Sequence, residues 1–396
     1  MSNTPIADFD TPDPWMIRHN NSYYLTYTCG DRVDILMSPN MQDFRSRSHR
    51  ITAWRPPPNT PWSVDLWAPE LHYINGTWYI YFCAAHPGQG NPSHRTVILR
   101  SSSQDPMDVR GWTFLGPLKG LPDHWNIDAT VFSVGGRLFC CYSGWPLGDF
   151  SDTQQDLFLV ELANPEQALQ NTLICISRAE LPWERPDGGR RGVNEGPTWL
   201  SISGLGAGFE GIVYSANGSW TSDYTLGLLR LVPGSDPLLA SSWQKRHQPL
   251  LKSCKDQGGP FGPGHASFIV PAVDDNGQGG HQQQVYCIYH ATEHEGQGWA
   301  NRKARVLCLH SHHFHPQAES CCCSMNPATA MMTGPIPGPG PGPGPGMMVY
   351  QGGGGTGAYG PPPPAGVTGR PDHGRPRQGG ILYDLGNRVM NKLREF

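Results

Sequence analysis

LWAPELHYINGTWYIYF, residues 66–82, consists of two apolar, aromatic-rich runs separated by Asn75-Gly76. An Asn-Gly pair between two such runs is a strong signal of a β-hairpin, because both residues tolerate the positive φ angles of a tight turn. The segment therefore predicts two antiparallel strands, the first of which opens on Ala68-Pro69-Glu70.

The same order of opening, short apolar strand, turn and aromatic-rich strand recurs along the chain. The openings are Asp13-Pro14-Trp15, Ala68-Pro69-Glu70, Asp128-Ala129-Thr130, Glu195-Gly196-Pro197 and Gly264-His265-Ala266. They recur roughly every 55 to 70 residues, a period typical of a propeller or another repeat array. The pattern predicts an all-β fold, a five-bladed β-propeller with four strands in each blade. A β-sandwich, the rival all-β fold, would not explain the recurring openings.

Three of the openings begin with a carboxylate residue, namely Asp13, Asp128 and Glu195. A propeller brings its innermost strands together around one axis. We therefore expect these acids to meet in one pocket, although they lie far apart in the sequence.

The composition limits the class of partner. Charged residues make up 16% of the 396 residues, aromatic residues make up 10%, and the formal net charge is −4. This balance suits a sugar ligand better than a charged one, and it gives no electrostatic reason to expect nucleic acid or an anionic membrane as a partner. No apolar run has the length needed to cross a bilayer. We expect a monomer.

The N-terminus, MSNTPIADFD, has neither the basic start nor the apolar core of a signal peptide. With this N-terminus, the chain is expected to be cytoplasmic. If the protein begins at a different residue, secretion remains an alternative. Its 11 cysteines fit that interpretation, since most lie in apolar, strand-like contexts. Free cysteine behaves there as a small hydrophobe, so we expect no disulfides.

The composition changes sharply at about residue 316. Residues 334–346 are mostly alternating Pro and Gly, which does not match the every-third glycine of collagen. We therefore divide the chain into a propeller domain, residues 1–315, and a disordered, low-complexity tail, residues 316–396, with a possible short terminal helix. Truncation after about Gln317 is expected to leave stability and activity nearly unchanged.

Histidines 310, 312, 313 and 315, followed by cysteines 321–323, are metal-ligand residue types. Their spacing matches no closed four-ligand zinc pattern, and consecutive cysteines rarely all reach one ion. We expect only adventitious metal binding there.

The openings resemble those of glycoside hydrolase family 43. The matching stretches are Asp13-Pro14-Trp15-Met16-Ile17-Arg18, Leu66-Trp67-Ala68-Pro69-Glu70-Leu71-His72, Asn126-Ile127-Asp128-Ala129-Thr130, Val193-Asn194-Glu195-Gly196-Pro197, Gly262-Pro263-Gly264-His265-Ala266 and Tyr289-His290-Ala291. The resemblance runs in order from about residue 6 to residue 310. It implies a five-bladed propeller that removes arabinose or xylose units from plant cell-wall polysaccharides with inversion, and it is greatest for the exo-acting α-L-arabinofuranosidases.

The resemblance also implies a role for each acid. Asp13 would be the general base that activates water, and Glu195 the general acid that protonates the leaving oxygen. Asp128 would hold Glu195 in position and keep its pKa up through its own nearby charge. Inversion requires this division, because water and the proton donor act on opposite faces of the sugar ring.

The remaining expected site residues are substrate-binding. His265 resembles the family's axial histidine, which touches a bound cation or an ordered water. The resemblance therefore allows a structural calcium near His265. We expect no cofactor for the chemistry itself. Arg302 resembles the fifth-blade arginine that binds sugar hydroxyls, with Arg305 close by in sequence. Trp67 is interpreted either as a sugar-stacking residue or as a packed propeller tryptophan. Glu70, which also opens a repeat, is interpreted as a structural carboxylate.

Other functions stay open at this stage. A β-xylosidase or an endo-arabinanase would use the same scaffold, and a non-catalytic carbohydrate-binding propeller is a third class. A retaining fructan-type enzyme would need an Asn-Asp-Pro-Asn opening and a Glu-Cys pair, and the chain has neither. Because the sequence after Leu309 turns His-rich, the fifth blade is expected to be incomplete or closed only by the N-terminal segment Ile6 to Phe9.

Overall fold

The computed structural model describes residues 4–45, 48–202, 208–271 and 284–322 of the 396. These residues form an all-β structure whose strands are connected by turns and short 3-10 helices. Within these ranges no helix is long and apolar enough to cross a membrane. The 3-10 helices are η1 Asn91–Ser93, η2 Val109–Gly111, η3 Gln170–Thr172, η4 Pro182–Glu184, η5 Asp187–Gly189, η6 Ala240–Ser242, η7 Lys255–Gln257 and η8 Ser311–Phe314.

The strands fall into consecutive antiparallel groups. Group 1 is β1 Trp15–His19, β2 Ser22–Thr26, β3 Val33–Ser38 and β4 His49–Trp54. Group 2 is β5 Val64–Ile74, β6 Thr77–Ala85, β7 Arg95–Ser101 and β8 Trp112–Pro117. Group 3 is β9 Asn126–Val134, β10 Arg137–Gly144 and β11 Gln154–Asn164, with β12 Gln167–Ala168 and β13 Ile174–Ser177 beside β11.

Group 4 is β14 Gly192–Ile202, β15 Phe209–Ala216 and β16 Thr225–Leu231, with β17 Trp243–Lys245 and β18 Leu251–Lys252 beside β16. Within the described ranges, its strand pairing with group 3 is limited to a short parallel pairing of β11 with β14. Group 5 is β19 Phe261–Ile269, β20 Gln284–Thr292 and β21 Lys303–His310. The turn expected at Asn75-Gly76 connects β5 to β6, and Gly135-Gly136 forms the corresponding connection from β9 to β10.

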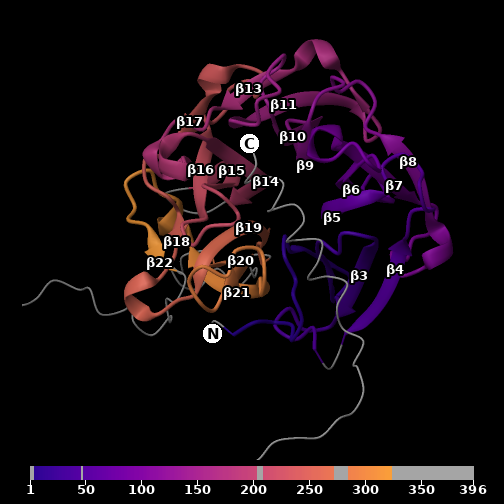
Figure 1. Ribbon diagram of the computed structural model, residues 1–396, viewed down its shortest axis with the longest axis horizontal. Coiled ribbons are helices and arrows are strands. Elements are labelled where there is room, and N and C mark those ends of the chain that lie inside the picture. The colour runs from indigo at the N-terminus through magenta and orange to yellow at the C-terminus, as the bar shows by residue number, and fades with distance from the viewer. Residues whose placement is uncertain (1–3, 46–47, 203–207, 272–283, 323–396) are drawn as a thin grey trace, which may run out of the picture. The chain divides into compact units, whose positions relative to one another are not determined.

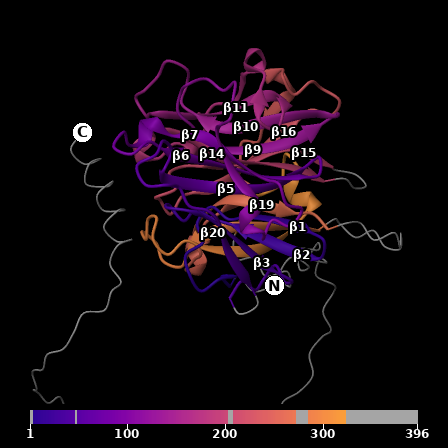
Figure 2. The same cartoon turned by 90° about the vertical axis from the view of Figure 1, so that its right-hand side faces the viewer.

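The first strands of the groups form a closed ring. β1 contacts β5, β5 contacts β9, β9 contacts β14, β14 contacts β19, and β19 contacts β1. Figure 1 shows β5, β9, β14 and β19 toward the middle and β4, β8, β13 and β17 toward the outside. Figure 2 shows the same inner strands near the middle of the side view.

Alternate residues of one strand hold neighbouring groups together. In β6, Trp78 and Ile80 pack in a cluster with group 1, whereas Tyr79 and Tyr81 pack in a different cluster with group 3 residues such as Val131. This follows from the two-residue period of a strand, which turns successive side chains to opposite faces. Because both faces are buried, the aromatic-rich second strands carry few polar side chains.

The N-terminal segment lies beside β21, as expected for an incomplete fifth group. The Ile6 N–H donates to the Ala304 carbonyl at 2.9 Å, and the Thr11 N–H donates to the Arg302 carbonyl at 2.8 Å. Ile6 is buried in the cluster that groups 1 and 5 share. The chain start therefore joins the first group to the last.

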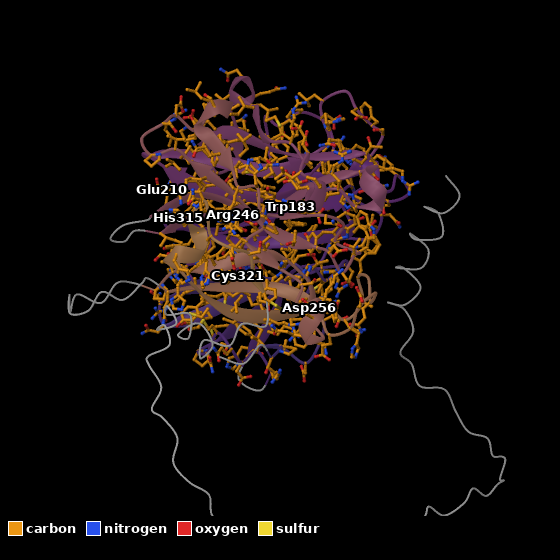
Figure 3. All side chains as sticks on the ribbon, turned by 90° about the vertical axis from the view of Figure 1, so that its left-hand side faces the viewer. Trp183, Glu210, Arg246, Asp256, His315 and Cys321 are labelled. Carbon is orange, nitrogen blue, oxygen red and sulfur yellow. A yellow bond between two sulfur atoms is a disulfide. The ribbon has the colours of Figure 1, made fainter. Side chains whose placement is uncertain are left out.

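The expected domain boundary at residue 315 is too early. β22, Cys321–Cys322, pairs in parallel with β18, and the Cys321 N–H donates to the Leu250 carbonyl at 2.7 Å. Cys321, labelled in Figure 3, is buried in the cluster between groups 4 and 5. Truncation after Gln317 would remove this strand, so its expected harmlessness is not supported. The Pro/Gly-rich segment and the terminal helix lie outside the described residues.

The expectation that the chain has no disulfide is also wrong at one position. Cys254, which precedes η7, is bonded to Cys322. The sequence placed Cys322 in a run of three cysteines, which concealed its partner 68 residues earlier. Cysteines in the predicted strands, such as Cys140 and Cys141, are free and buried as expected.

A β-bulge recurs where the inner strands open. In β5, Trp67 pairs with Cys83 and Glu70 pairs with Tyr81, so the inner strand has one extra residue. β9, β14 and β19 show the same shift. The residue at this position has positive φ in each group: Asp13 (54°), Ala68 (46°), Asp128 (55°), Gly196 (51°) and His265 (46°). Bulges re-aim side chains and are frequent beside active sites.

Candidate active site

The bulges bring most of the predicted site residues to one end of the ring. Asp13, Asp128 and His265 occupy the positive-φ position of groups 1, 3 and 5. Glu195 lies one residue before that position, which Gly196 occupies in group 4. The sequence openings at Glu195 and Gly264 were therefore out of register by one residue.

Asp13 lies between a hydroxyl and two imidazoles. The Thr28 hydroxyl donates to Asp13 Oδ2 at 2.6 Å. Asp13 Oδ1 lies 3.3 Å from His265 Nδ1 and 3.4 Å from His290 Nδ1. The Asp13 side chain retains 21% of its exposure, so one side of this hydrogen-bonded carboxyl can still reach a water molecule.

Glu195 is held in a more buried environment. The Gln155 side-chain amide donates to Glu195 Oε2 at 3.1 Å. Burial, and then the neighbouring charge of Asp128, raises the pKa of Glu195 to about 7. At neutral pH a large fraction of this carboxyl therefore keeps its proton, as a general acid must.

Asp128 is buried and acts on the main chain beside Glu195. Its Oδ2 accepts a hydrogen bond from the Gly196 N–H at 2.9 Å. Burial raises the pKa of Asp128, the nearby His265 lowers it, and Asp13 raises it further. Gly196 directly follows Glu195, so this hydrogen bond fixes the backbone next to Glu195 and helps to set the position of its carboxyl group.

Arg302, rather than Arg305, belongs to this cluster. Arg302 is buried, and its Nη1 donates to the Gly262 carbonyl at 3.4 Å and lies 2.8 Å from His290 Nε2. The Arg305 guanidinium instead lies 3.6 Å from the Glu293 carboxylate. The structure thus places Arg302, and not Arg305, near Asp13 and Glu195, and a sugar-binding role for Arg302 stays a prediction.

Besides Thr28, three residues around the acids carried no role in the sequence analysis: Gln155, Tyr224 and His290. The Asp13 N–H donates to His290 Nδ1 at 2.9 Å, and the Tyr224 ring stacks on the His290 ring at 5.6 Å. Burial, and then the charge of Glu195, raises the pKa of the Tyr224 hydroxyl well above its ordinary value. The Tyr289-His290-Ala291 motif was the only signal among these three, since the others lie in apolar or turn sequence.

Arg302 Nε is buried and lacks a hydrogen-bond partner among the described residues, and the buried Tyr224 hydroxyl interacts with the side chains of Glu195 and Ser215. Unpaired buried donors are costly and rare in native structures. The position of these two side chains beside Glu195 and Asp13 suits a polar ligand that carries several hydroxyl groups.

Trp67 and Glu70 have largely structural surroundings. The Trp67 ring is half-buried and stacks on His94, with 3.8 Å between ring centroids. Glu70 Oε2 lies 2.8 Å from His72 Nε2, and burial lowers the pKa of His72 to about 3 and raises that of Glu70 well above its ordinary value. Both side chains of the pair are buried in the core. A sugar-stacking role for Trp67 stays a prediction.

The described residues give little support for a calcium site. They contain no group of three or more His, Cys, Asp or Glu side chains arranged to hold a metal ion, including the histidines before residue 316. Calcium takes 6–8 oxygen ligands, whereas His265 offers a nitrogen that faces Asp13. A structural calcium near His265 stays a prediction.

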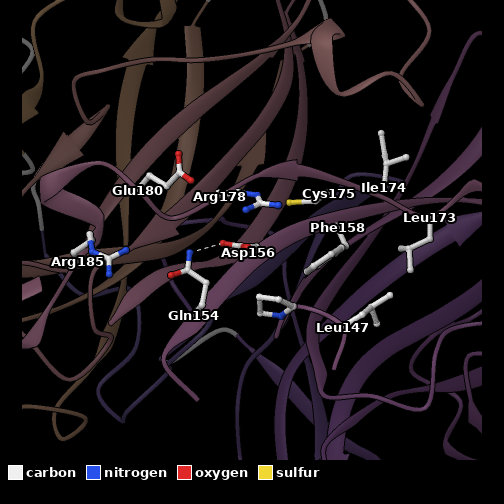
Figure 4. A pocket seen from close by; sticks show the side chains of 11 residues that line it. Leu147, Gln154, Asp156, Phe158, Leu173, Ile174, Cys175, Arg178, Glu180 and Arg185 are labelled. Atoms are coloured by element: carbon white, nitrogen blue, oxygen red, sulfur yellow. Dashed lines mark hydrogen bonds between the residues drawn. The ribbon is translucent and has the colours of Figure 1, made fainter. Parts of the chain in front are cut away.

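A cavity of about 590 Å³ lies away from these carboxylates, beside β11 and β13. Figure 4 shows Asp156 and Gln154, which share a hydrogen bond of 2.6 Å, on its wall with Arg178 and Glu180. None of the predicted site residues lines it. This cavity therefore does not coincide with the candidate active site, which rests on the carboxylate cluster.

Comparisons with known proteins agree with the motifs. The family model described as glycosyl hydrolases family 43 matches residues 2–315. An extracellular exo-α-(1→5)-L-arabinofuranosidase from Streptomyces avermitilis is 31% identical over 280 residues, 67% of this chain and 54% of that protein. A β-xylosidase from Formosa agariphila is 24% identical over 65% of this chain and 39% of that protein. The solved α-L-arabinofuranosidase of Lactobacillus brevis is 27% identical, with a TM-score of 0.64 over 75% of this chain and 90% of that one. The chain thus spans about half the length of the streptomycete relative.

Proposed function

The chain belongs to glycoside hydrolase family 43, and from that membership we propose that it is an inverting α-L-arabinofuranosidase that releases L-arabinofuranose from arabinan- or arabinoxylan-type oligosaccharides. The observation that carries the proposal is the pairing of two carboxyls with different surroundings. Asp13 is partly exposed and hydrogen-bonded, whereas Glu195 is buried and has its pKa raised to about 7. We further infer that strand groups 1 to 5 are the blades of a five-bladed propeller.

In the proposed reaction, Asp13 is the general base. Its carboxylate takes a proton from a water molecule, whose oxygen forms a bond to the anomeric carbon of the sugar. The Thr28 hydroxyl and the imidazoles of His265 and His290 hold the Asp13 carboxylate in one orientation. A base that is held in one orientation supports catalysis, because it can take the proton from the attacking water in the transition state without first losing conformational freedom.

Glu195 is the general acid. As the glycosidic bond breaks, its proton moves to the leaving oxygen, and the electron pair of that bond stays on this oxygen. Single displacement of this kind inverts the anomeric configuration and needs about 6.5–9.5 Å between the two carboxyl groups. Asp128 contributes twice, by raising the pKa of Glu195 and by holding the Gly196 N–H.

The sugar preference is supported by the names of the similar proteins and by the chemistry of the cluster. Arg302 and Tyr224 place polar side-chain groups next to the proposed acid and base, where sugar hydroxyl groups would lie. We expect plant cell-wall oligosaccharides as substrates, and a monomer that binds neither nucleic acid nor membranes.

Purified protein tests the proposal on a matched pair of substrates, nitrophenyl α-L-arabinofuranoside and nitrophenyl β-D-xyloside. We expect the arabinofuranoside to be cleaved faster by at least about tenfold, a difference of about 1.4 kcal/mol in transition-state binding. Glu210→Gln, which changes an exposed glutamate of β15 labelled in Figure 3, is the control and is expected to keep full activity. Preference for the xyloside would reassign the chain to the β-xylosidases.

Two other outcomes identify the remaining candidates. Rapid shortening of long arabinan with little free arabinose would indicate an endo-arabinanase. Binding of arabino-oligosaccharides without hydrolysis, at any pH between about 4 and 9, would indicate a non-catalytic carbohydrate-binding propeller. The presence of Asp13, Asp128 and Glu195 in one cluster argues against that last function.

A further inference from the structure

Two tryptophans form an edge-to-face pair at the rim of the ring. Trp299, in the connection from β20 to β21, is 42% exposed. Its ring centroid lies 6.1 Å from that of Trp220, in the connection from β15 to β16, at an interplanar angle of 71°. The Trp299 indole N–H donates to the Ser219 hydroxyl at 3.1 Å. The exposed ring is therefore held in one orientation.

The connection that carries Trp220 is folded around the indole. A Cβ atom at Gly218 would lie 2.6 Å from the Trp220 ring, so only glycine fits there without displacing it. The Asn217 side-chain oxygen accepts hydrogen bonds from the Gly218 N–H at 2.8 Å and from the Thr221 hydroxyl at 3.0 Å. The Arg191 guanidinium lies 5.8 Å from the centre of the Trp220 ring. A ligand would meet a pre-organised surface, which lowers the entropy cost of binding.

The tryptophan pair lies at the same end of the ring as the acids. Because neighbouring strands are antiparallel, the connection between the second and third strand of a group returns to the end where the first strand begins. In group 4 that connection leads from Trp220 to Tyr224, and in group 5 it leads from Trp299 to Arg302. Both Tyr224 and Arg302 belong to the candidate active site.

The two connections also contact each other directly. The Gly296 N–H donates to the Ser222 hydroxyl at 3.0 Å, and the Gly262 N–H, at the start of the fifth group, donates to the Ser222 carbonyl at 3.2 Å. The Gly262 carbonyl in turn accepts from Arg302. This continuous set of contacts joins the exposed tryptophans to the buried arginine.

We propose that Trp220 and Trp299 form a binding site for a sugar unit on the leaving-group side of the bond that is cleaved. The inference rests on the proposed function. Glu195, the proposed acid, lies in group 4 together with Trp220, and the leaving group departs on the side of the acid. Indole rings provide large apolar area with little loss of conformational freedom, which suits the C–H face of a sugar ring. Trp299 is 42% exposed, yet its indole N–H is tethered to Ser219 and its ring is paired with Trp220, which is the arrangement that a stacking platform for a sugar ring requires.

The test compares two substrates that differ only beyond the scissile bond. Arabinotriose places further sugars on the leaving-group side, whereas methyl α-L-arabinofuranoside places none. Trp299→Ala is expected to raise KM for arabinotriose about tenfold with kcat nearly unchanged, and to leave kcat/KM for the methyl glycoside unchanged. Trp299→Tyr keeps an aromatic face and is expected to recover most of the loss. Tyr73→Ala, which removes an aromatic ring that is 37% exposed at the other end of β5, is the control and is expected to change neither substrate.

Equal losses on both substrates would overturn the proposal, because Trp299 would then support the catalytic cluster itself. No loss on arabinotriose would also overturn it. If the wild-type protein hydrolyses neither substrate, the proposed function fails, and calorimetric titration with arabinotriose decides the sugar site separately. Binding that Trp299→Ala weakens about tenfold would support the site in a non-catalytic protein, whereas no binding, or equal binding by both proteins, would overturn it.

Discussion

Replacing Glu195 by glutamine should make the protein more stable at alkaline pH. Burial and the charge of Asp128 raise the pKa of Glu195 from its ordinary 4.5 to about 7. The unfolded chain therefore loses this proton at lower pH than the folded chain does. As pH rises from about 4.5 to about 7, ionisation favours the unfolded state, and the free energy of unfolding falls.

The size of the effect follows from the shift. The pKa of Glu195 differs by about 2.5 between the unfolded chain (4.5) and the folded chain (about 7). At pH 8 this difference lowers the free energy of unfolding by about 3 kcal/mol, because a pKa difference of 1 corresponds to about 1.4 kcal/mol. Glutamine cannot ionise, and its side-chain oxygen can still accept the hydrogen bond from Gln155. For a domain of this size, about 3 kcal/mol corresponds to roughly 5 °C in Tm.

The assay is thermal unfolding of wild type and Glu195→Gln at a fixed scan rate between pH 4.5 and pH 8.5. We expect the two Tm values to be similar at the acid end and the variant to gain about 5 °C at pH 8. Glu210→Gln, at an exposed position of β15, controls for the change of net charge and should show no such trend. A Tm difference that does not grow with pH would refute a raised pKa at Glu195.

Three further predictions concern the roles of the acids and the end of the chain. Glu195→Gln should nearly abolish cleavage of an arabinan linkage yet spare most activity on a dinitrophenyl arabinofuranoside, whose leaving group needs no proton. Asp13→Asn should lower the steady-state rate on both substrates about 100-fold or more. The reverse pattern would exchange the two roles. Wild-type kcat/KM should fall about tenfold per pH unit above about pH 7, since the acid must be protonated, and an undiminished rate at pH 9 would contradict this. Truncation after residue 331 should leave Tm unchanged. Truncation after Gln317 should lower Tm by several degrees, because this shorter chain lacks β22 and the disulfide partner of Cys254. Equal Tm values for the two truncated proteins would show that β22 contributes nothing to stability.

The hairpins and the order of the strand groups were predictable because their signals are local. Asn75-Gly76 and the alternating run after it predict a hairpin from turn chemistry and strand period alone, and the structure contains that hairpin. The order of the groups follows the order of the openings. These features depend on residues that are neighbours in sequence.

The register of the openings was not predictable in the same way. Pattern matching placed Glu195 and Gly264 at the openings, whereas the bulge places Gly196 and His265 there. The positive φ that defines the position is adopted by Asp, Ala, Gly and His alike, so no residue type marks it. The one-residue offset explains how group 4 contributes an acid from the position before its bulge.

Partners that come from distant segments were also missed. His290 contacts Asp13 across 277 residues, and Gln155 contacts Glu195 across 40. In sequence, His290 follows an apolar strand and Gln155 opens one, so neither differs from a strand-end residue. The pairing of Cys254 with Cys322 was hidden for the same reason.

The configuration of the first-formed product tests the central claim, single displacement by the Asp13 and Glu195 pair, most directly. Proton NMR of α-L-arabinofuranoside hydrolysis, recorded within the first minutes and before mutarotation, distinguishes the two anomers of the released arabinose. We predict that the β-anomer appears first and that the α-anomer grows in only later. An α-anomer as the first product would mean retention through a covalent intermediate and would contradict the account.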